Sequence, residues 1–402
     1  MGYGVGLIGA GLIAGLHLDA LKASPYVDFV DIAEESEALL AQRKAEYGDL
    51  IRFTTTNYQD LLAKDELQVV DITVPHYLHY PVCKAAFEAG KQVIMEKPIT
   101  IELEHGVELC RLARDKGLRF YVSMNQRLMP AHVKVAELLA SGALGKPYLA
   151  LFNLMGYDPR MLDADSWKGD WEKAGGGGLI DTGFHGAYLL KGFLGPVKSV
   201  QAVTKRTLSN LESKADDIAV AIWEHESGAI SELAVCYAVK TDPWYETRRI
   251  YCEEASLHFD DDPIRPLKIG RGGQYEWVEG LEAPQGTFAQ SVSTSVALGL
   301  EALATGGAFP SEPEESVEVH VIGGHPLLGK WSPAQAPGPM TYLGQKRYRI
   351  QLELPKGSVL EYKYIQRKKD QTVWELGLEN RYLQVPYEGS IRINDQWERK
   401  GH

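Results

Sequence analysis

Short apolar runs alternate with helical stretches over the amino-terminal third of the chain. The apolar runs at 5–8, 27–33, 68–74, 92–96 and 119–123 predict buried strands. Helical spacing of apolar residues predicts a helix that ends near 23 and further helices at 57–64, 80–89 and 101–116. Strands that alternate with helices are typical of a parallel, doubly wound sheet, so residues 1–123 are expected to form one α/β unit.

The pattern changes after one more predicted helix, at 131–141. Strand-like runs follow at 147–156, 197–206, 216–225, 229–238 and 246–252. They predict a mostly antiparallel sheet with one face covered, which is an α+β substrate unit over 124–313. The acidic, proline-bearing stretch 310–315 predicts a linker.

Helical periodicity disappears beyond this stretch. Short, evenly spaced apolar runs lie at 317–322, 348–354, 359–366, 372–376 and 381–385. This spacing predicts a small all-β sandwich over residues 317–402. The whole chain is therefore expected to contain three units.

Composition narrows the classes of partner. The 402 residues are 45% hydrophobic and 24% charged, with a formal net charge of -12, which is typical of a globular protein and argues against nucleic acid as a main partner. No apolar run is long enough to span a bilayer, and Met1 leads straight into a predicted strand, so no membrane partner and no signal peptide are expected. A cytoplasmic protein is expected, with the plastid stroma left open.

The four cysteines are Cys83, Cys110, Cys236 and Cys252. Their spacing fits neither a metal site nor a redox motif, so buried free thiols are expected and no metal site is predicted.

A glycine-rich turn follows the first predicted strand. Gly9-Ala10-Gly11-Leu12-Ile13-Ala14 fits the pattern G-x-G-x-x-G/A in its alanine form. Gly9 permits the tight turn, Gly11 lets the backbone approach a pyrophosphate, and Ala14 allows the helix to pack closely on the strand. The first unit is therefore expected to be a Rossmann domain that binds a dinucleotide.

An acidic residue follows the second predicted strand. Glu34 lies twenty residues beyond Ala14, a spacing that suits an acid bonding the ribose hydroxyls of NAD. No arginine or lysine is near it in the sequence to receive a 2′-phosphate, so NAD is expected in preference to NADP, although a loop elsewhere could supply a cation. The alternative is a solvated carboxylate at a strand end.

A lysine stands at the carboxyl end of the predicted strand 92–96, where open α/β sheets bind their ligands. In Glu96-Lys97-Pro98, an ammonium in this place could exchange protons with a ligand. The alternative is a polar turn after a strand. His76 and His79, at the mouth of the same sheet, are expected from position alone to cap or pack.

A run of glycines, 175–178, precedes a predicted helix that carries Asp181 and His185. Glycines let the backbone pass close to a ligand or to another element. Asp181 could cap the helix, and a carboxylate beside the His185 imidazole would favour its charged form and fix its orientation. His185 is thus a candidate general acid or base, and the alternative is a capping aspartate with a packed histidine.

These motifs resemble, in order, the glucose–fructose oxidoreductase, inositol dehydrogenase and MocA-like (Gfo/Idh/MocA) family over residues 1 to about 313. Further motifs of the resemblance are Thr73-Val74-Pro75 with His76 and His79, Asn125-Gln126-Arg127 and Ser141-Gly142-Ala143-Leu144-Gly145. The resemblance implies an α/β Rossmann domain plus an α+β open-sheet substrate domain. It also implies hydride transfer between NAD(P) and a sugar, polyol or related carbinol.

The same resemblance implies roles for residues. Lys97 and His185 would be the acid–base pair at the carbinol oxygen, and Asp181 would orient them or share the proton. The implied cofactor-binding residues are Gly9, Gly11, Leu12, Ile13, Ala14, Glu34, Thr73, Pro75, His79, Glu96, Lys97 and Asn125.

The last unit resembles the starch-binding module of carbohydrate-binding family 20 over about 317–397. The motifs are Leu327-Leu328-Gly329-Lys330-Trp331, Leu354-Pro355-Lys356-Gly357, Glu361-Tyr362-Lys363-Tyr364 and Val373-Trp374-Glu375 with Asn380-Arg381. The resemblance implies an α-glucan site formed by Trp331, Lys363, Trp374 and Asn380, and a second site that includes Tyr342. Tryptophan faces can stack on glucose rings, and the alternative is two core tryptophans.

The sequence thus predicts an NAD(P)-dependent sugar or polyol oxidoreductase anchored to starch or glycogen, for which reduction of 1,5-anhydrofructose would suit the fusion. At the junction, a helix that normally continues the oxidoreductase and the first strand of the starch module are both missing from the pattern. The alternatives are a glycan-binding scaffold with a structural or regulatory cofactor domain and an NAD-dependent glycosidase. Members of the resembled family commonly pair their open sheet faces, so a homodimer or tetramer is expected.

Overall fold

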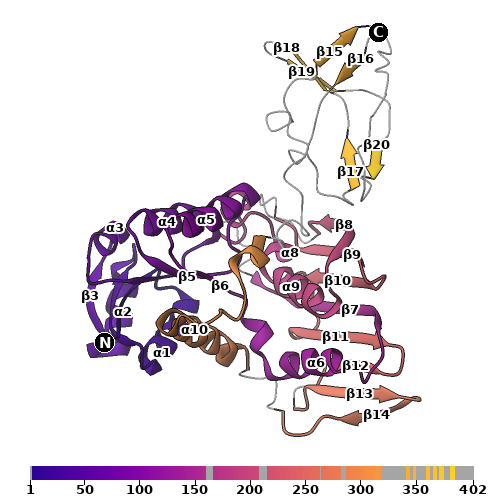
Figure 1. The fold of residues 1–402 in the computed structure, drawn as a ribbon, viewed down its shortest axis with the longest axis horizontal. Helices are drawn as coiled ribbons and strands as arrows, with labels where there is room; N and C mark the ends of the chain where they lie inside the picture. The colour runs from indigo at the N-terminus through magenta and orange to yellow at the C-terminus, as the bar shows by residue number, and fades with distance from the viewer. Residues whose placement is uncertain are drawn as a thin grey trace.

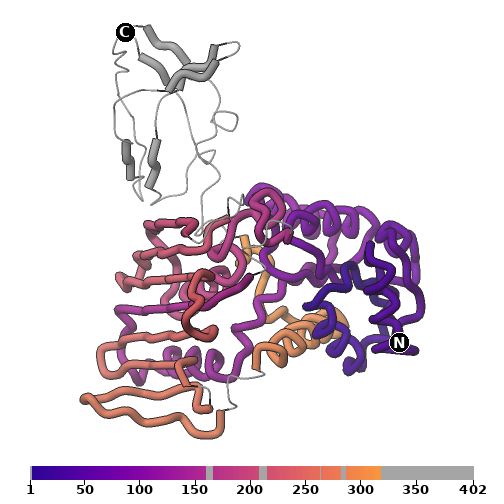
Figure 2. The backbone as a smooth tube through the Cα atoms, turned by 180° about the vertical axis from the view of Figure 1, so that it is seen from behind, coloured from indigo at the N-terminus to yellow at the C-terminus, as the bar shows by residue number. Residues whose placement is uncertain are grey.

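The computed structural model describes residues 2–159, 166–207, 215–262, 264–281 and 287–317, and short strands between 341 and 384. Within residues 2–317 the chain forms a six-stranded sheet and an eight-stranded sheet, which lie side by side (Figure 1). Figure 2 shows the same arrangement from behind.

The six-stranded sheet has the order β3-β2-β1-β4-β5-β6, and every neighbouring pair is parallel. Its strands are β1 (Tyr3–Ile8), β2 (Val27–Ala33), β3 (Ile51–Thr55), β4 (Val69–Ile72), β5 (Gln92–Glu96) and β6 (Phe120–Ser123). The order turns back between β1 and β4, and open α/β sheets bind dinucleotides at such a switch point. The predicted Rossmann fold is confirmed, although the edge strand β3, with most of its residues exposed, was not predicted.

Helices cover both faces of this sheet (Figure 1). On one face lie α1 (Leu12–Ala23), α2 (Glu37–Tyr47) and α10 (Thr287–Thr305); on the other lie α3 (Tyr58–Leu62), α4 (His76–Glu88) and α5 (Leu103–Asp115). Two 3-10 turns, η1 (Gly48–Leu50) and η2 (Asn125–Leu128), complete the connections of this part.

α10 joins this core from far along the chain. Its Val296 and Leu300 share one buried cluster with Ile94 of β5 and Tyr121 of β6. The helix lies in the 124–313 stretch that the sequence assigned to the substrate unit, and the sequence did not predict it. Its buried face includes small polar residues such as Ser295, which weaken the apolar pattern of a helix.

The eight-stranded sheet has the order β14-β13-β12-β11-β7-β10-β9-β8 and is antiparallel except between β7 and β10. Its strands are β7 (Pro147–Met155), β8 (Val197–Lys205), β9 (Ile218–His225), β10 (Ile230–Cys236), β11 (Tyr245–Cys252), β12 (Ser256–Phe259), β13 (Leu267–Arg271) and β14 (Gln274–Trp277). β7 to β11 match the predicted runs, whereas β12 to β14 were not predicted.

One face of this sheet is covered. α6 (Pro130–Ala140) and α9 (Gly183–Leu194) pack on it, and the short helices α7 (Trp171–Ala174) and α8 (Gly178–Asp181) lead into α9 (Figure 1). The other face leaves large apolar side chains exposed, among them Val203, Val220 and Ile222. The predicted sheet with one covered face is therefore confirmed.

The stretch 310–315 is packed rather than extended as a linker. Residues 313–317 form a helical turn, and Ser316 is fully buried, where its hydroxyl accepts from the backbone N–H of Ile99 at 3.3 Å. Glu315 forms an ion pair with Arg127 at 2.7 Å, and Val317 packs against the core cluster of α4 and α5. The predicted linker is wrong here because these contacts were not visible in composition.

Six further strands are described in the last unit, all in antiparallel pairs: β15 (Thr341–Gly344) with β16 (Arg347–Arg349), β17 (Val359–Tyr362) with β20 (Arg381–Gln384), and β18 (Ile365–Lys368) with β19 (Gln371–Trp374). This agrees with an all-β unit. The carbohydrate-binding residues predicted from the sequence, Trp331, Tyr342, Lys363, Trp374 and Asn380, lie outside the residues whose side chains the structure describes.

Two expectations from composition can be compared with the structure. All four cysteines are buried and free, as predicted. Among the described residues, no helix combines the length and apolar character needed to cross a membrane.

Candidate active site

Glu96 ends strand β5, and Lys97 follows it at the carboxyl end of the sheet. The two side chains contact different groups: Glu96 contacts His17 of α1, whereas Lys97 contacts Asp181 of α8. The Lys97–Pro98 peptide bond that follows is cis.

Lys97 meets a carboxylate from the second half of the chain. Its Nζ donates to Asp181 Oδ1 at 2.8 Å and to the Asp181 backbone oxygen at 3.0 Å. Lys168 Nζ donates to the other carboxylate oxygen, Oδ2, at 2.5 Å. These three residues form the open cluster, in which one anion lies between two cations at the carboxyl end of β5.

The cations keep Asp181 ionised. Burial alone would raise the pKa of Asp181, but the charges of Lys97 and Lys168 outweigh burial and hold that pKa well below its usual range. The sequence left open that Asp181 caps the helix of His185. Asp181 instead ends α8, and α9 begins after Thr182 without a side-chain cap.

His185 lies on α9 and is 5% exposed. Its Nδ1 is 2.8 Å from the hydroxyl of Tyr188, which accepts from the backbone N–H of Gln126 at 3.0 Å. Tyr188 is fully buried and has no other acceptor among the described residues. The phenol proton is therefore best donated to His185 Nδ1, which assigns the proton of the neutral ring to Nε2.

The imidazole is neutral rather than charged. Burial lowers the pKa of His185 well below its usual range, and the positive charge of Lys97 lowers it further. The sequence predicted that Asp181 would favour the charged form and orient the ring. Asp181 opposes this lowering only in part, and no hydrogen bond joins the two, because its carboxylate is taken by the two lysines.

The glycine run 175–178 serves close packing against another element. The backbone N–H groups of Gly177 and Leu179 donate to the two carboxylate oxygens of Asp216 at 2.8 and 3.1 Å. A Cβ on Gly177 would lie 1.9 Å from the Asp216 backbone oxygen, so only glycine fits. Of the two interpretations left open by the sequence, contact with another element is the one observed.

A second group of charges lies behind the open cluster. His17 of α1 is fully buried, with Nδ1 2.9 Å from Asp71 Oδ2 on β4 and Nε2 3.2 Å from Glu96 Oε1 on β5. Burial would lower the pKa of His17, but the charge and hydrogen bond of Asp71 and the contact with Glu96 raise it to about 10. His17, Asp71 and Glu96 form the sealed cluster, one imidazolium between two carboxylates.

The glycine-rich turn fits a dinucleotide. Gly9 has φ +94°, and a Cβ there would lie 2.8 Å from the Thr73 backbone oxygen, so the turn requires glycine. A Cβ on Gly11 would meet nothing within 4 Å, and the neighbouring Leu12 is 81% exposed. An open backbone surface at a helix N-terminus suits a pyrophosphate. Ile13 and Ala14 follow in the first turn of α1, and Ala14 is buried, as its packing role predicts.

Glu34 is anchored to the same turn. Its carboxylate accepts from the backbone N–H of Ala10 at 2.8 Å and of Ser36 at 3.0 Å. Arg43 of α2 also lies on this turn, where it donates to the backbone oxygens of Ala10 and Gly11 at 3.1 and 2.6 Å. The structure thus brings to the turn a cation that is distant in the sequence.

Three residues expected to bind the cofactor are buried in this structure. His79 is fully buried, with its ring nitrogens 2.6 and 2.9 Å from the backbone oxygens of Pro98 and Val74. Asn125 is 1% exposed and donates to Ser291 of α10 at 2.8 Å. Glu96 belongs to the sealed cluster, so all three side chains make polar contacts within the chain. Their role in cofactor binding stays a prediction.

The other two predicted cofactor residues border the switch point. Thr73 follows β4, and its hydroxyl donates to the Gly9 backbone oxygen at 2.9 Å. Pro75 precedes α4 as its N-cap.

Sequence reasoning missed two members of the site. Lys168 lies in the connection before α7, where no motif marks it. Tyr237 follows β10 and donates to Asp181 Oδ2 at 3.4 Å. His76, expected to cap or pack, is 5% exposed. Burial lowers the pKa of His76 well below its usual range, and the charge of Lys97 lowers it further. Among the described residues, no group of three or more histidine, cysteine, aspartate or glutamate side chains is arranged so that it could hold a metal ion.

Three family matches divide the chain. Residues 3–124 match the family described as "Oxidoreductase family, NAD-binding Rossmann fold", and residues 132–258 match "GFO/IDH/MocA C-terminal domain". Residues 311–394 match "Starch binding domain".

Individual proteins agree with these matches. The chain is 35% identical over 199 residues to an uncharacterized oxidoreductase of Synechocystis sp. (strain PCC 6803), a match covering 49% of this chain and 53% of that protein. It is 26% identical over 238 residues to a 1,5-anhydro-D-fructose reductase of Ensifer adhaerens, a match covering 58% of this chain and 69% of that protein. The chain spans about half the length of the Synechocystis protein and of other curated relatives that it matches.

A solved structure shows the same fold. Levoglucosan dehydrogenase in complex with NADH superposes with a TM-score of 0.73 at 21% identity, over 81% of this chain and 96% of that one. The family matches on both sheets and on the carboxyl-terminal unit account for most of the sequence. The chain therefore belongs to the GFO/IDH/MocA oxidoreductase family, with an NAD-binding Rossmann domain, and carries a starch-binding domain.

Proposed function

We propose that the chain is an NAD(P)-dependent oxidoreductase that moves a hydride to or from a carbinol carbon of a sugar or polyol. The observation that carries this proposal is the open cluster beside His185, at the carboxyl end of β5 in a dinucleotide-binding sheet. Two ammonium groups and one carboxylate leave an excess of positive charge in a mostly buried site. Such a site stabilises a developing alkoxide more than the neutral alcohol or carbonyl.

Lys97 is the group we assign to proton exchange with the reacting oxygen. Asp181 holds the Lys97 ammonium in place through two contacts, and Lys168 holds Asp181 from its other side. His185, neutral and protonated on Nε2, would donate a second hydrogen bond to the same oxygen. A neutral imidazole polarises a carbonyl without itself losing a proton.

The bound nicotinamide cofactor would supply the acceptor or donor of the hydride. Gly9, Gly11 and Leu12 would hold its pyrophosphate, and Glu34 its ribose hydroxyls. We retain the preference for NAD, because Arg43 is already engaged with two backbone oxygens and with Glu46 at 2.7 Å.

We infer that the substrate is a small sugar derivative. The similar proteins named above act, by their names, on 1,5-anhydro-D-fructose and levoglucosan, which are both anhydro sugars. A starch-binding domain on the same chain would raise the local concentration of sugars released from α-glucan. Reduction of 1,5-anhydrofructose satisfies both features.

We keep the division of the chain into 1–123, 124–313 and 317–402 as a proposal, with Trp331, Lys363, Trp374 and Asn380 as the main α-glucan site and Tyr342 in a second one. The exposed apolar side chains of Val203, Val220 and Ile222, on β8 and β9 at the opposite edge of the eight-stranded sheet from β14, support a homodimer or tetramer. Four buried free thiols suit a reducing compartment such as the cytoplasm.

One assay tests the proposed reaction. Absorbance at the NADH band would be followed with a panel of sugars and polyols, including 1,5-anhydrofructose, using NAD and NADP in parallel. Substrate-dependent change of that band supports the proposal. Release of sugar without net change would identify a glycosidase, and binding to granular starch without either activity would identify a scaffold.

Replacing the imidazole tests the role of His185. His185→Ala is expected to lower kcat by about 10²–10⁴-fold, the usual contribution of a positioned acid or base. The control is His105→Ala, a histidine on α5 outside the cluster, which should keep normal turnover. Near-full turnover of His185→Ala would remove this residue from the proposed mechanism.

A further inference from the structure

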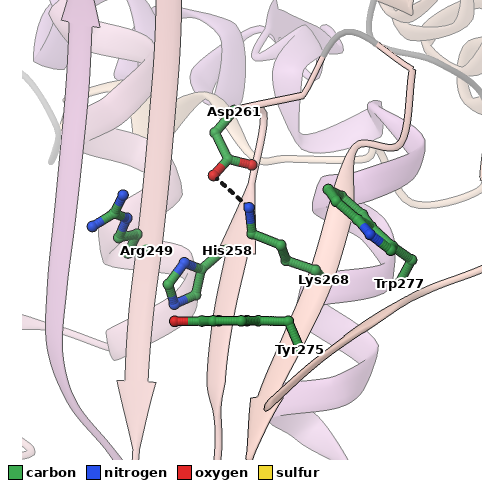
Figure 3. A pocket seen from close by; sticks show the side chains of 6 residues that line it. All are labelled: Arg249, His258, Asp261, Lys268, Tyr275 and Trp277. Atoms are coloured by element: carbon green, nitrogen blue, oxygen red, sulfur yellow. Dashed lines mark hydrogen bonds and ion pairs between the residues drawn. The ribbon is translucent and has the colours of Figure 1, made fainter. Parts of the chain in front are cut away.

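A hollow lies on the uncovered face of the eight-stranded sheet, at the end formed by β11 to β14 (Figure 3). Its volume is about 360 Å³. Six residues line it: Arg249, His258, Asp261, Lys268, Tyr275 and Trp277. None of them belongs to the open cluster or to the glycine-rich turn, so the proposed reaction leaves this hollow unexplained.

Four of these side chains form one row across the sheet. Arg249 is paired with His258, His258 with Lys268, and Lys268 with Trp277 on successive strands. Arg249 and Lys268 therefore flank His258 in this row, and their two positive charges repel each other across the ring. An anion in the hollow would offset this repulsion.

The protein itself compensates this charge only in part. Asp261 accepts from Lys268 Nζ at 3.0 Å, as the dashed line in Figure 3 shows. No carboxylate in the described part of the chain forms an ion pair with Arg249, which leaves one excess positive charge in the hollow. Arg265 adds another cation at the rim, where its guanidinium lies 4.0 Å from the centre of the Trp277 ring.

The pKa of His258 depends on these positive charges. The residue is 6% exposed and lies between Arg249 and Lys268 in the row. Burial lowers the pKa of His258, and the charges of Arg249 and Lys268 lower it further, whereas Asp261 opposes them. Nε2 of the neutral ring that results is 3.2 Å from the Ser256 hydroxyl, so Nδ1 is the nitrogen we assign to a hydrogen bond inside the hollow.

The aromatic side chains add a flat apolar surface beside the cations. Tyr275 is 57% exposed, and its ring lies beside the imidazole of His258 (Figure 3). A Cβ on Gly270 would lie 2.9 Å from Cε1 of Tyr275, so the glycine makes room for the ring on the sheet. An exposed ring face of this kind suits the apolar face of a sugar.

We propose that this hollow binds a sugar monophosphate, with the phosphate at Arg249, His258 and Lys268 and the sugar ring over Tyr275. A dianionic phosphate accepts strong hydrogen bonds from a guanidinium and an ammonium, and its charge offsets that of the row. Inorganic phosphate would supply the charge but not the ring, and an unphosphorylated sugar would supply the ring but not the charge.

Calorimetry and histidine NMR on the full-length protein would test the proposal. The probes are inorganic phosphate, glucose 6-phosphate and glucose, at constant ionic strength maintained with chloride, and the His258 signal is identified with His258→Gln. We expect glucose 6-phosphate to bind more tightly than inorganic phosphate and to raise the pKa of His258, because it brings an anion next to the ring. A pKa of His258 that is unchanged by both glucose 6-phosphate and inorganic phosphate would overturn the proposal.

Two outward-facing substitutions localise the binding. Arg249→Gln and Tyr275→Leu are each expected to weaken glucose 6-phosphate about tenfold, the effect of losing one charge-assisted or stacking contact. Lys116→Gln, at an exposed cation just after α5, is the matched control. Hydride-transfer activity should be unchanged in all three, and binding that survives Arg249→Gln at full strength would place the phosphate elsewhere and overturn the site.

Discussion

The open cluster and the sealed cluster start from neighbouring residues, Lys97 just after β5 and Glu96 at its end, and have opposite compositions. The open cluster places one carboxylate between two cations, with side chains 9–21% exposed. The sealed cluster places one cation between two carboxylates, with side chains 0–10% exposed. Two adjacent residues at the carboxyl end of β5, Glu96 and Lys97, therefore belong to two charged sites of opposite composition, and we assign only the one of Lys97 to the proposed reaction.

This difference in charge composition indicates different roles for the two clusters. Buried charges contribute little net stability when paired but are costly when one partner is lost. The sealed cluster should therefore control folding and the position of β5, while the open cluster should control chemistry. Substitutions in the two clusters should change different measurements.

Replacing Lys97 should give the largest effect on activity. Lys97→Met is expected to lower kcat/KM by about 10²–10⁴-fold, because the proposed proton donor is lost. Folding should change little, since Lys168 still pairs with Asp181 at 2.5 Å. Steady-state kinetics and urea unfolding measure the two effects, with Lys116→Met as the control. Retained turnover would contradict the assignment of the open cluster to chemistry.

Replacing His17 should show the reverse pattern. His17→Asn leaves two buried carboxylates facing each other, and the loss of one partner of a buried pair costs about 3–5 kcal/mol in the free energy of unfolding. Urea unfolding measures this loss. Adding Asp71→Asn should restore part of it, because one of the unpaired charges is then removed. A stable but inactive His17→Asn protein would show that the two clusters are not separate in function.

The same histidine predicts a pH dependence of stability. Because the pKa of His17 is raised to about 10 in the folded protein, its contribution is complete below the ordinary value near 6.5 and is lost as pH rises through 10. Between these limits the free energy of unfolding should fall by up to about 1.4 kcal/mol per pH unit. Thermal unfolding of wild type and His17→Asn from pH 7 to 10 tests this, and parallel curves would refute it.

Replacing Lys168 should give the smallest effect. Lys168→Met removes one of two cations that hold the pKa of Asp181 down, so that pKa rises. The acid limb of the kcat/KM profile should move to higher pH, and kcat/KM at neutral pH should fall by about tenfold, the effect of one charge-assisted hydrogen bond. Lys173→Met, at an exposed position on α7, is the control. An unmoved acid limb would mean that Lys97 alone keeps Asp181 ionised.

Much of the fold and part of the site could be predicted from the sequence. The strands that carry a continuous apolar pattern were found, whereas β3 and β12 to β14 were missed because they are short or lie at or near a sheet edge. Spacing put Asp181 and His185 on one helix face, and the family resemblance added Lys97 to the same site. The sequence could not show that the hydroxyl of Tyr188, rather than Asp181, contacts the His185 imidazole. It also could not show that Lys168 pairs with the Asp181 carboxylate.

The sealed cluster was not predicted, although the position of Asp71 in the sequence indicates a buried partner. Asp71 lies in the run Val69-Val70-Asp71-Ile72, where a carboxylate inside a buried strand requires a partner. Its partner, His17, is on a helix whose apolar pattern hides a buried histidine. The identity of such a partner depends on how α1 crosses the sheet, which local pattern does not specify.

The packed segment 311–317 decides where the two halves of this protein can be separated. The starch-binding match begins at residue 311, but Ser316 and Val317 are built into the oxidoreductase, and Glu314 and Glu315 form ion pairs with Arg114 and Arg127 at 2.7 Å. A truncation made at the family boundary would strip these contacts from the catalytic half. An excised oxidoreductase should therefore keep every residue through Val317.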